Sequence, residues 1–245
     1  MERNIRTQAA VLSVRKMGEL HKAITLLSPD LGLVDAVVFG GRKGRKTALA
    51  PLFSIGDMLL YHNPVKKEYS VVESDNAFIA QSITEDLAAT YTAAFFCEII
   101  TKSPSDEPAE TFELLKSAMM ALEKDTGHRK RITAAFIWKL MQISGTAPDL
   151  EFCPVCDRSY QDDEALLFSN SLGIPCCKSC SDSAAMILLP GMRRYLRYTM
   201  DKSFDEAASV ELNPAAEDRI FDYMLRWAAI FSQTQLRTLK DLSQF

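Results

Sequence analysis

The chain has 245 residues, of which 47% are hydrophobic and 24% are charged, and its formal net charge at pH 7 is −4. This composition is ordinary for a globular protein and excludes a low-complexity or collagen-like chain. The sequence lacks a run of about 18 apolar residues that could span a bilayer, and its first residues lack the apolar core of a signal peptide. We therefore expect a cytoplasmic protein without a membrane partner.

The charge is distributed unevenly along the chain. Residues 1–50 contain nine Lys and Arg against four acidic residues, whereas residues 81–245 contain 17 against 24. These net charges of opposite sign predict that the first part of the chain binds anions and that the second part has a different function. The acidic pI of about 5.5 does not exclude nucleic acid as a partner, because local patches of charge set the field that a phosphate backbone meets.

Residues 7–79 are expected to form short β-strands, because runs rich in Val, Ile, Leu and Thr are separated there by turn residues such as Gly18 and Gly40-Gly41. Five strands at this spacing predict a small barrel of about 75 residues, the size of an oligonucleotide-binding (OB) fold. A small sandwich or an SH3-like barrel would show the same periodicity. The predicted strands are residues 7–15, 21–27, 33–39, 57–61 and 69–73.

From about residue 83 onward, apolar residues recur every three or four positions, which predicts helices. We therefore predict an α+β multidomain chain. A five-stranded OB-fold β-barrel occupies residues 1–80, and an all-α domain with an inserted cysteine motif at about residues 150–182 occupies residues 81–245. The predicted helices begin near residues 84 and 106 and cover about 129–144, 184–200 and 214–240.

The inserted motif contains two Cys-x-x-Cys pairs, Cys153/Cys156 and Cys177/Cys180, with twenty residues between them. The cytoplasm keeps thiols reduced, so a disulfide framework is not expected there. Two such pairs can bring four thiolates around one Zn²⁺, whereas a lone pair would equally suit dithiol redox chemistry. Cys176 adjoins Cys177 and could replace it as a ligand. We predict one structural Zn²⁺ per chain.

Catalytic signals are missing from the sequence. A catalytic zinc needs an open coordination position and a nearby acid or base, and deaminases place His-x-Glu ahead of their cysteine pair. The three histidines, at positions 21, 62 and 128, do not fit that pattern. The sequence also lacks the glycine-rich phosphate loops and the Gly-x-Ser-x-Gly elbow. We therefore expect no catalytic residues and no enzymatic activity.

A basic loop follows the third predicted strand. Four cations stand together in Arg42-Lys43-Gly44-Arg45-Lys46, and such a group cannot pack into a core. On the rim of a barrel these cations would hold the phosphates of a single strand, with affinity that falls as salt rises. Arg15 and Lys16, at the end of the first predicted strand, extend the patch. A solvated loop is the alternative.

Two further groups of residues are candidates for binding. Aromatic residues in or near the strands could stack on nucleobases, although aromatic residues in strands more often belong to the core. They are Phe39, Phe53, Tyr61 and Tyr69. Arg129 and Arg131 begin a predicted helix, the end at which the helix dipole disfavours cations, and they could instead receive an acidic partner. A solvated face is the alternative for these arginines.

In the order of these parts the chain resembles the RecO family of bacterial DNA repair and recombination mediators. The resemblance covers essentially the full length, and it is most specific where residues 145–150, Gly-Thr-Ala-Pro-Asp-Leu, lead into Cys153. Leu172-Gly173 departs from the Gly-Gly that is common in the family, and one extra residue precedes Cys177. The other matching segments are residues 10–19, 40–43 through 52–53, Phe168 and 173–180.

The resemblance implies an N-terminal OB fold and a helical domain that carries the zinc motif. It also implies binding of single- and double-stranded DNA, annealing of complementary strands, partnership with RecR, loading of RecA and association with the nucleoid. The helical domain would capture the acidic, apolar C-terminal tail of single-strand-binding protein (SSB). The alternative is a zinc-stabilised protein-interaction adaptor that does not bind DNA directly.

Overall fold

The computed structural model describes residues 3–242 and residue 244, apart from the side chain of Arg45. The chain divides into two compact units, Met1–Thr126 and Gly127–Phe245. None of the helices in the described residues is long and apolar enough to cross a membrane. The first unit contains three helices in addition to the strands. The predicted division into domains of residues 1–80 and 81–245 stays a prediction.

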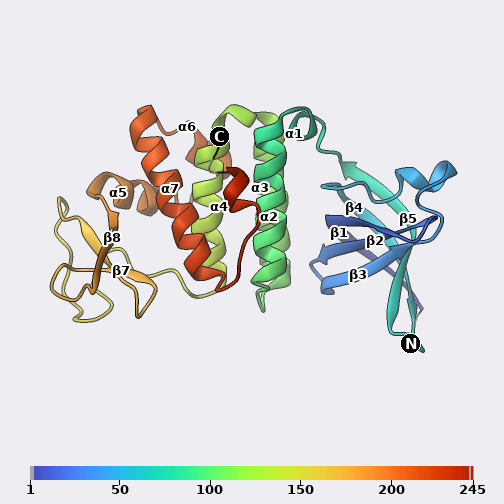
Figure 1. Ribbon diagram of the computed structural model, residues 1–245, viewed down its shortest axis with the longest axis horizontal. Coiled ribbons are helices and arrows are strands. Elements are labelled where there is room, and N and C mark those ends of the chain that lie inside the picture. Colours follow the sequence, from blue (N-terminus) through green and yellow to red (C-terminus); the bar gives the residue numbers. More distant parts are fainter. Residues whose placement is uncertain (1–2, 243, 245) are drawn as a thin grey trace. The chain divides into compact units, whose positions relative to one another are not determined.

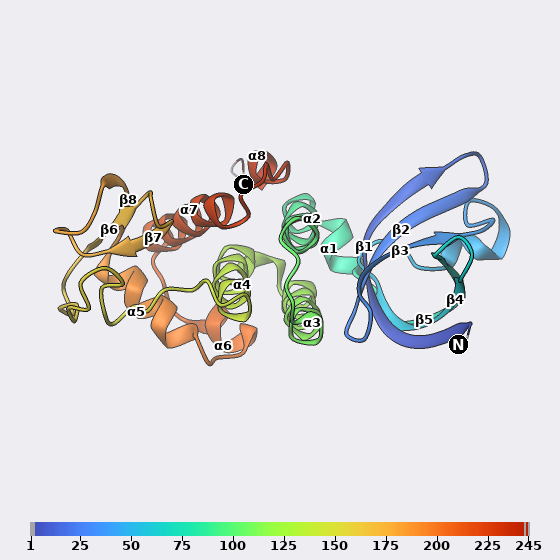
Figure 2. The ribbon, with the colours of Figure 1, turned by 90° about the horizontal axis from the view of Figure 1, so that it is seen from below.

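Five strands form a closed barrel in the first unit (Figures 1 and 2). Their order around the barrel is β1-β2-β3-β5-β4, and β3 and β5 run parallel while the other pairs are antiparallel. This closed five-stranded arrangement is the OB fold, so the sandwich and SH3-like alternatives are wrong. The strands are β1 (Asn4–Met17), β2 (His21–Ser28), β3 (Gly32–Val38), β4 (Ile55–Asn63) and β5 (Glu68–Phe78).

The barrel closes because β1 is long enough to pair with both β2 and β4. Its pairing with β2 shifts between Val11 and Ser13, and such a bulge bends a strand and increases its twist. Alternate side chains point into the barrel, where Val11, Ile24 and Leu60 are at most 1% exposed. Burial of this kind stabilises a fold by roughly 1.5–3 kcal/mol per large apolar side chain.

Three helices complete the first unit: α1 (Gln81–Glu85), α2 (Leu87–Lys102) and α3 (Pro108–Lys124). Helix α2 packs against β1, and α3 packs against β2. The side chain of Asp86 accepts a hydrogen bond from the amide of Ala89 at 2.9 Å and so caps the start of α2. The carboxylate of Glu123 accepts from two amides at the start of α1, which fastens α1 to the end of α3.

In the second unit, α4 (Arg129–Ile143) packs along α7 (Pro214–Phe231) (Figure 1). Their buried indoles, Trp138 and Trp227, meet with ring centroids 5.8 Å apart. Asn213 caps α7 by accepting from the amide of Ala216. The remaining elements are α5 (Pro190–Thr199), α6 (Phe204–Ser209), α8 (Leu239–Leu242), and a sheet of β6 (Leu166–Ser169), β7 (Ile174–Cys176) and β8 (Ser183–Leu188).

Two of the predicted helices are partly wrong. Residues 183–188 form β8, which pairs with β6, and the helix α5 begins only at Pro190. Met186 and Leu188 are buried while Ile187 is exposed, which is the period of two that a strand requires. Helix α7 ends at Phe231, well before residue 240, and the chain then passes to the short α8.

Gly56 gives a test of barrel closure. A Cβ atom at this position would lie 1.9 Å from the carbonyl oxygen of Asp75, because the β4–β5 pairing shifts beside it. We expect Gly56→Ala to lower the free energy of unfolding by about 1–3 kcal/mol, as overpacking does. Urea unfolding followed by circular dichroism measures the change.

The matched control is Gly191→Ala. A Cβ atom there meets nothing within 4 Å, and Gly191 lies within α5, where alanine favours the helix. This variant should be at least as stable as the original chain. An unfolding midpoint of Gly56→Ala equal to that of the original would contradict the close approach of β4 and β5.

Candidate metal centre and nucleic-acid interface

The first cysteine pair lies on a tight turn. The amide of Cys153 donates to the carbonyl of Arg158 at 2.8 Å, and the amide of Asp157 donates back to the carbonyl of Cys153 at 2.9 Å. Asp157 takes the left-handed conformation with φ of 55°, which short polar side chains tolerate. The chain thus reverses between residues 153 and 158 and turns both thiols of the pair to one side.

The second pair follows the hairpin of β6 and β7. Gly173, with φ of 70°, makes the turn of that hairpin, and Leu167 pairs with Cys176. A further turn, in which the amide of Cys180 donates to the carbonyl of Cys177 at 3.0 Å, brings these two thiols together. The Sγ atoms of Cys153, Cys156, Cys177 and Cys180 all lie within 4.8 Å of one another.

These four thiols could hold a metal ion. Burial raises the pKa of the Cys153 thiol, but the backbone amides of Cys177, Val155 and Cys156 outweigh it and bring that pKa down to about 6. A lowered pKa favours the thiolate, the form of cysteine that binds metals, whereas contacts with the thiols of Cys177 and Cys156 raise the pKa of Cys180. The donor set consists of sulfur atoms, which suits Zn²⁺ in a closed structural site.

An ion pair stands beside the cluster. Arg158 bonds Glu164 through both terminal nitrogens, at 2.9 and 2.6 Å, and a further contact with Cys177 also raises the pKa of the guanidinium. A cation at this place offsets part of the negative charge that several thiolates share. The sequence does not indicate this pair, because the spacing of Arg158 and Glu164 carries no recognised signal.

Cys176 lies outside the group of four. It is the last residue of β7, its side chain is buried, and its Sγ atom is not among the four that lie within 4.8 Å of one another. Successive residues of a strand point to opposite faces, which explains why Cys177 joins the cluster and its neighbour does not.

The knuckle that carries the cysteines is fastened to α7 by Trp227. Its indole Nε1 donates to the carbonyl of Gly173 at 3.0 Å, and its ring meets Phe168 edge-on.

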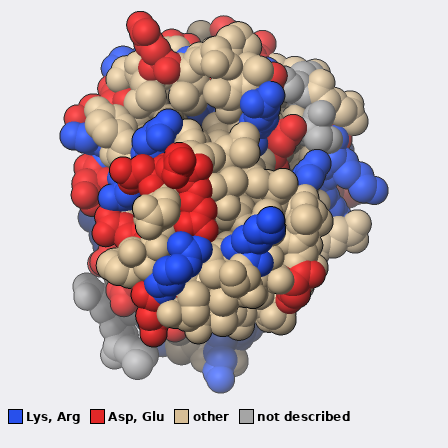
Figure 3. Space-filling model, turned by 90° about the vertical axis from the view of Figure 1, so that its left-hand side faces the viewer, with Lys and Arg blue, Asp and Glu red and all other residues tan. Residues whose placement is uncertain are grey.

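On the face of the second unit shown in Figure 3, basic and acidic side chains lie interspersed around uncharged surface. That face does not present a patch of one sign among the residues drawn in colour.

The predicted basic loop of the first unit is folded. Residues Gly44–Ala48 form a 3₁₀ helix, η1, and the Arg42 guanidinium donates to the carbonyl of Gly18 at 3.0 Å. Lys22 donates from its Nζ atom to the carbonyl of Thr47 at 2.8 Å. The loop therefore lies against the turn between β1 and β2. Arg42, Lys43 and Lys46 are exposed, and the side chain of Arg45 lies outside the described part.

Arg15 and Lys16 lie at the same end of β1, and both are exposed. Arg15 faces Asp35 at 3.7 Å, but both side chains are exposed, and an ion pair of this kind contributes little free energy. Arg15 can therefore leave Asp35 to meet a phosphate. Lys16 stands directly opposite Lys22 across the strands, and like charges in that position repel. Lys22 was not among the predicted DNA-binding residues, although its position beside the turn between β1 and β2 indicates that it belongs to the patch.

The four aromatic candidates differ in exposure. Phe53 is 2% exposed and belongs to the core, while Tyr61 and Tyr69 are half-buried. Tyr69 also packs on His62, with ring centroids 4.8 Å apart. Phe39 is 51% exposed. Of these four rings, that of Phe39 is the most accessible to a ligand.

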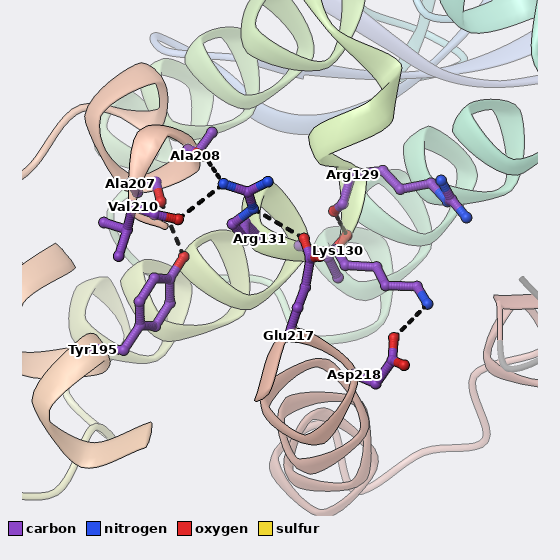
Figure 4. Close-up of polar contacts among 10 residues, drawn as sticks. Arg129, Lys130, Arg131, Tyr195, Ala207, Ala208, Val210, Glu217 and Asp218 are labelled. Atoms are coloured by element: carbon purple, nitrogen blue, oxygen red, sulfur yellow. Dashed lines mark hydrogen bonds and ion pairs between the residues drawn. The ribbon is translucent and has the colours of Figure 1, made fainter. Parts of the chain in front are cut away.

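Arg131, a predicted partner-binding residue, is engaged inside the second unit (Figure 4). Its Nε atom pairs with Glu217 at 2.9 Å, and its Nη1 atom donates to the carbonyls of Ala208 and Val210. The preceding residue of α4, Lys130, pairs with Asp218 at 2.7 Å. A role for Arg129 and Arg131 in partner binding stays a prediction, and for Arg131 it would require these bonds to be given up.

Comparisons with known proteins give the same result for both units. The chain matches the family model "Recombination protein O N terminal" over residues 1–74 and "Recombination protein O C terminal" over residues 84–230. It is 25% identical to the DNA repair protein RecO of Alkaliphilus metalliredigens over 216 residues, or 86% of each chain. It is 29% identical to that of Bifidobacterium animalis subsp. lactis over 243 residues, or 97% of this chain and 98% of the relative.

A pair of substitutions tests which neighbouring cysteine binds the metal. We expect Cys177→Ala to lose the metal, because three thiolates leave the site incomplete, and Cys176→Ala to retain about one zinc ion per chain. Metal content is measured by mass spectrometry after gel filtration of protein prepared with ample zinc. Retention in Cys177→Ala together with loss in Cys176→Ala would assign the third ligand to Cys176.

Proposed function

Because the chain belongs to the RecO family of DNA repair proteins, we propose that it is a non-enzymatic recombination mediator. It binds single- and double-stranded DNA through the barrel and anneals complementary strands. Together with RecR it helps to load RecA onto DNA that is coated by SSB. The zinc of the second unit is structural in this proposal, and the protein acts in the cytoplasm at the nucleoid.

The cations at one end of the barrel carry this proposal. Arg42, Lys43 and Lys46 stand on the folded loop, and Arg15, Lys16 and Lys22 stand on the adjoining ends of β1 and β2. The acidic residues on these segments, on β3 and on the turns that join the three strands are Glu19, Asp30 and Asp35. Of these, Asp30 accepts a hydrogen bond from Thr7, at the opposite end of the β1–β2 pair.

The excess of positive charge suits a polyanion. Phosphates that replace counterions at Lys and Arg release those counterions, which drives binding and makes it depend on salt. Annealing brings two polyanions together, and their mutual repulsion opposes it. A cationic surface that touches both strands lowers that repulsion. The barrel end thus offers what annealing needs without requiring a catalytic residue.

We place the capture of the SSB tail on the second unit. The residues predicted for it are Arg129 and Arg131, but the charge of Arg131 already meets Glu217. A hollow of about 330 Å³ in the same unit offers an alternative place. It combines apolar side chains, such as Met186 and Met192, with the exposed Arg219 and Arg226. Asp222 also lines it.

The alternative function is a protein-interaction adaptor that grips an acidic protein instead of DNA. The same exposed cations would serve either partner. The OB-fold barrel and the family favour DNA. Direct titration separates the two.

Titration with DNA tests the basic loop. We expect the double variant Lys43→Glu/Lys46→Glu to bind a labelled single-stranded oligonucleotide at least about tenfold more weakly at low salt, because it replaces attraction to phosphates by repulsion. The original chain should itself lose affinity steeply as salt rises. Fluorescence anisotropy at two salt concentrations measures both effects.

The matched control is Arg194→Glu/Arg226→Glu, which makes the same change of net charge at exposed positions of the second unit. Its affinity for DNA should stay within about twofold of the original, since long-range effects of exposed charges are screened. Equal affinity of the loop variant and the original would overturn the assignment of DNA binding to this loop.

A peptide titration tests the place of the SSB tail. The probe is a labelled peptide whose aspartates precede a carboxy-terminal phenylalanine. We expect Arg226→Ala to weaken its binding by about fivefold, the effect of losing one exposed ion pair of up to about 1 kcal/mol, while Arg194→Ala leaves it unchanged. Weakening by Arg129→Ala but not by Arg226→Ala would place the tail at the start of α4.

A further inference from the structure

Three large apolar side chains are exposed at the cationic end of the barrel. Met17 is 44% exposed, Leu20 43% and Phe39 51%. They lie close together, because Met17 pairs with His21 across β1 and β2, and the ring of Phe39 meets the ring of His21 edge-on with centroids 5.2 Å apart. We name these three residues the apolar rim. Apolar side chains that gather at the surface often mark a binding site.

The backbone beside Phe39 is held in place. The amide of Gly40 donates to the Nδ1 atom of His21 at 3.0 Å, and the amide of Arg42 donates to the carbonyl of Leu20 at 3.1 Å. Gly40 has a φ of 72°, and a Cβ atom at Gly41 would lie 2.8 Å from the side chain of Val38, so both positions favour glycine. Phe39 is therefore already oriented, which reduces the entropy lost when a ligand packs on it.

The apolar rim lies among the cations of the barrel end. Leu20 and Arg42 share a backbone hydrogen bond, Lys16 precedes Met17, and Lys22 follows His21. An aromatic ring that stands beside several cations matches a nucleic-acid strand, whose bases stack while its phosphates meet Lys and Arg. The match is specific for single strands, because the bases of a duplex are already stacked on one another and do not expose their faces.

We propose that Phe39, supported by His21, is a platform on which one base of a single-stranded polynucleotide stacks. The platform gives the barrel a preference for single-stranded over double-stranded DNA. This inference rests on the proposed binding of DNA by the barrel and adds to it the contact that distinguishes the two forms. The basic loop supplies affinity for the phosphates of both forms, and Phe39 adds affinity for the exposed bases of one.

The test compares three probes of equal length: a single-stranded oligonucleotide, the same strand with abasic sites throughout, and the duplex. We expect Phe39→Ala to weaken binding of the first by about five- to hundredfold, the range that stacking on one aromatic side chain gives. Binding of the abasic strand and of the duplex should stay within about twofold of the original, because the phosphate contacts remain. Fluorescence anisotropy at low salt measures all three.

Two further substitutions separate stacking from apolar contact. Phe39→Leu keeps an apolar side chain without a ring and should weaken single-strand binding much as Phe39→Ala does. Phe39→Trp keeps a ring and should preserve it, and the added tryptophan fluorescence should be quenched by the single strand but not by the abasic strand. Val72→Ala, at a side chain 45% exposed on β5, is the control for loss of apolar surface from the same barrel.

Other outcomes would overturn the inference. Single-strand affinity of Phe39→Ala equal to that of the original would show that no base stacks there. Equal weakening for all three probes would show that Phe39 only shapes the loop. If the original chain binds none of the probes but binds an acidic peptide in a manner that depends on Phe39, the rim is a protein-binding site, and the proposed DNA binding fails as well.

Discussion

The convergence of four thiols within 4.8 Å is the constraint on which the second unit depends. Thiolates this close repel one another unless a cation lies between them, and the chain supplies only partial compensation from backbone amides and Arg158. The sheet β6-β7-β8 has three short strands, and a sheet of that size has little apolar surface of its own to bury. A bound metal would join the two cysteine turns and so hold the knuckle against Trp227 and α7.

The first unit depends on a different constraint, the closure of its β-barrel. Closure of the barrel pairs β1 with β4 and brings β3 to β5 at Ala36 and Val37, which leaves little strand edge in the described barrel for pairing with other chains. Binding must then use loops and exposed side chains. The basic loop and the apolar rim lie at one end of the barrel, where charge and exposed apolar surface coincide. In the proposed function, the first unit contacts a polyanion, and a metal ion bound by the four cysteines would stabilise the second.

Some of this organisation follows from the sequence alone, because its signals are local. The spacing of two Cys-x-x-Cys pairs predicts a metal site, and a run of four cations predicts a loop that binds anions. The choice between Cys176 and Cys177 needed the register of β6 and β7, since only the register decides which thiol points at the cluster. The sequence predicts a helix over residues 184–200, because Ala, Met, Ile and Leu suit a helix or a strand, but pairing with β6 makes residues 183–188 a strand.

The exposure of individual side chains, and ion pairs between residues far apart in the chain, could not be predicted from the sequence. Phe39 and Phe53 both lie next to apolar residues in the sequence, yet the ring of Phe39 is half exposed and that of Phe53 is buried. The charge of Arg131 is paired with Glu217, and the sequence does not indicate this partner because it lies 86 residues further along the chain. The most direct test of the metal centre is X-ray absorption at the zinc edge of the purified chain. We predict four sulfur atoms at about 2.3 Å from one zinc; a nitrogen or oxygen neighbour at about 2.0 Å, or no bound zinc, would contradict the structural site.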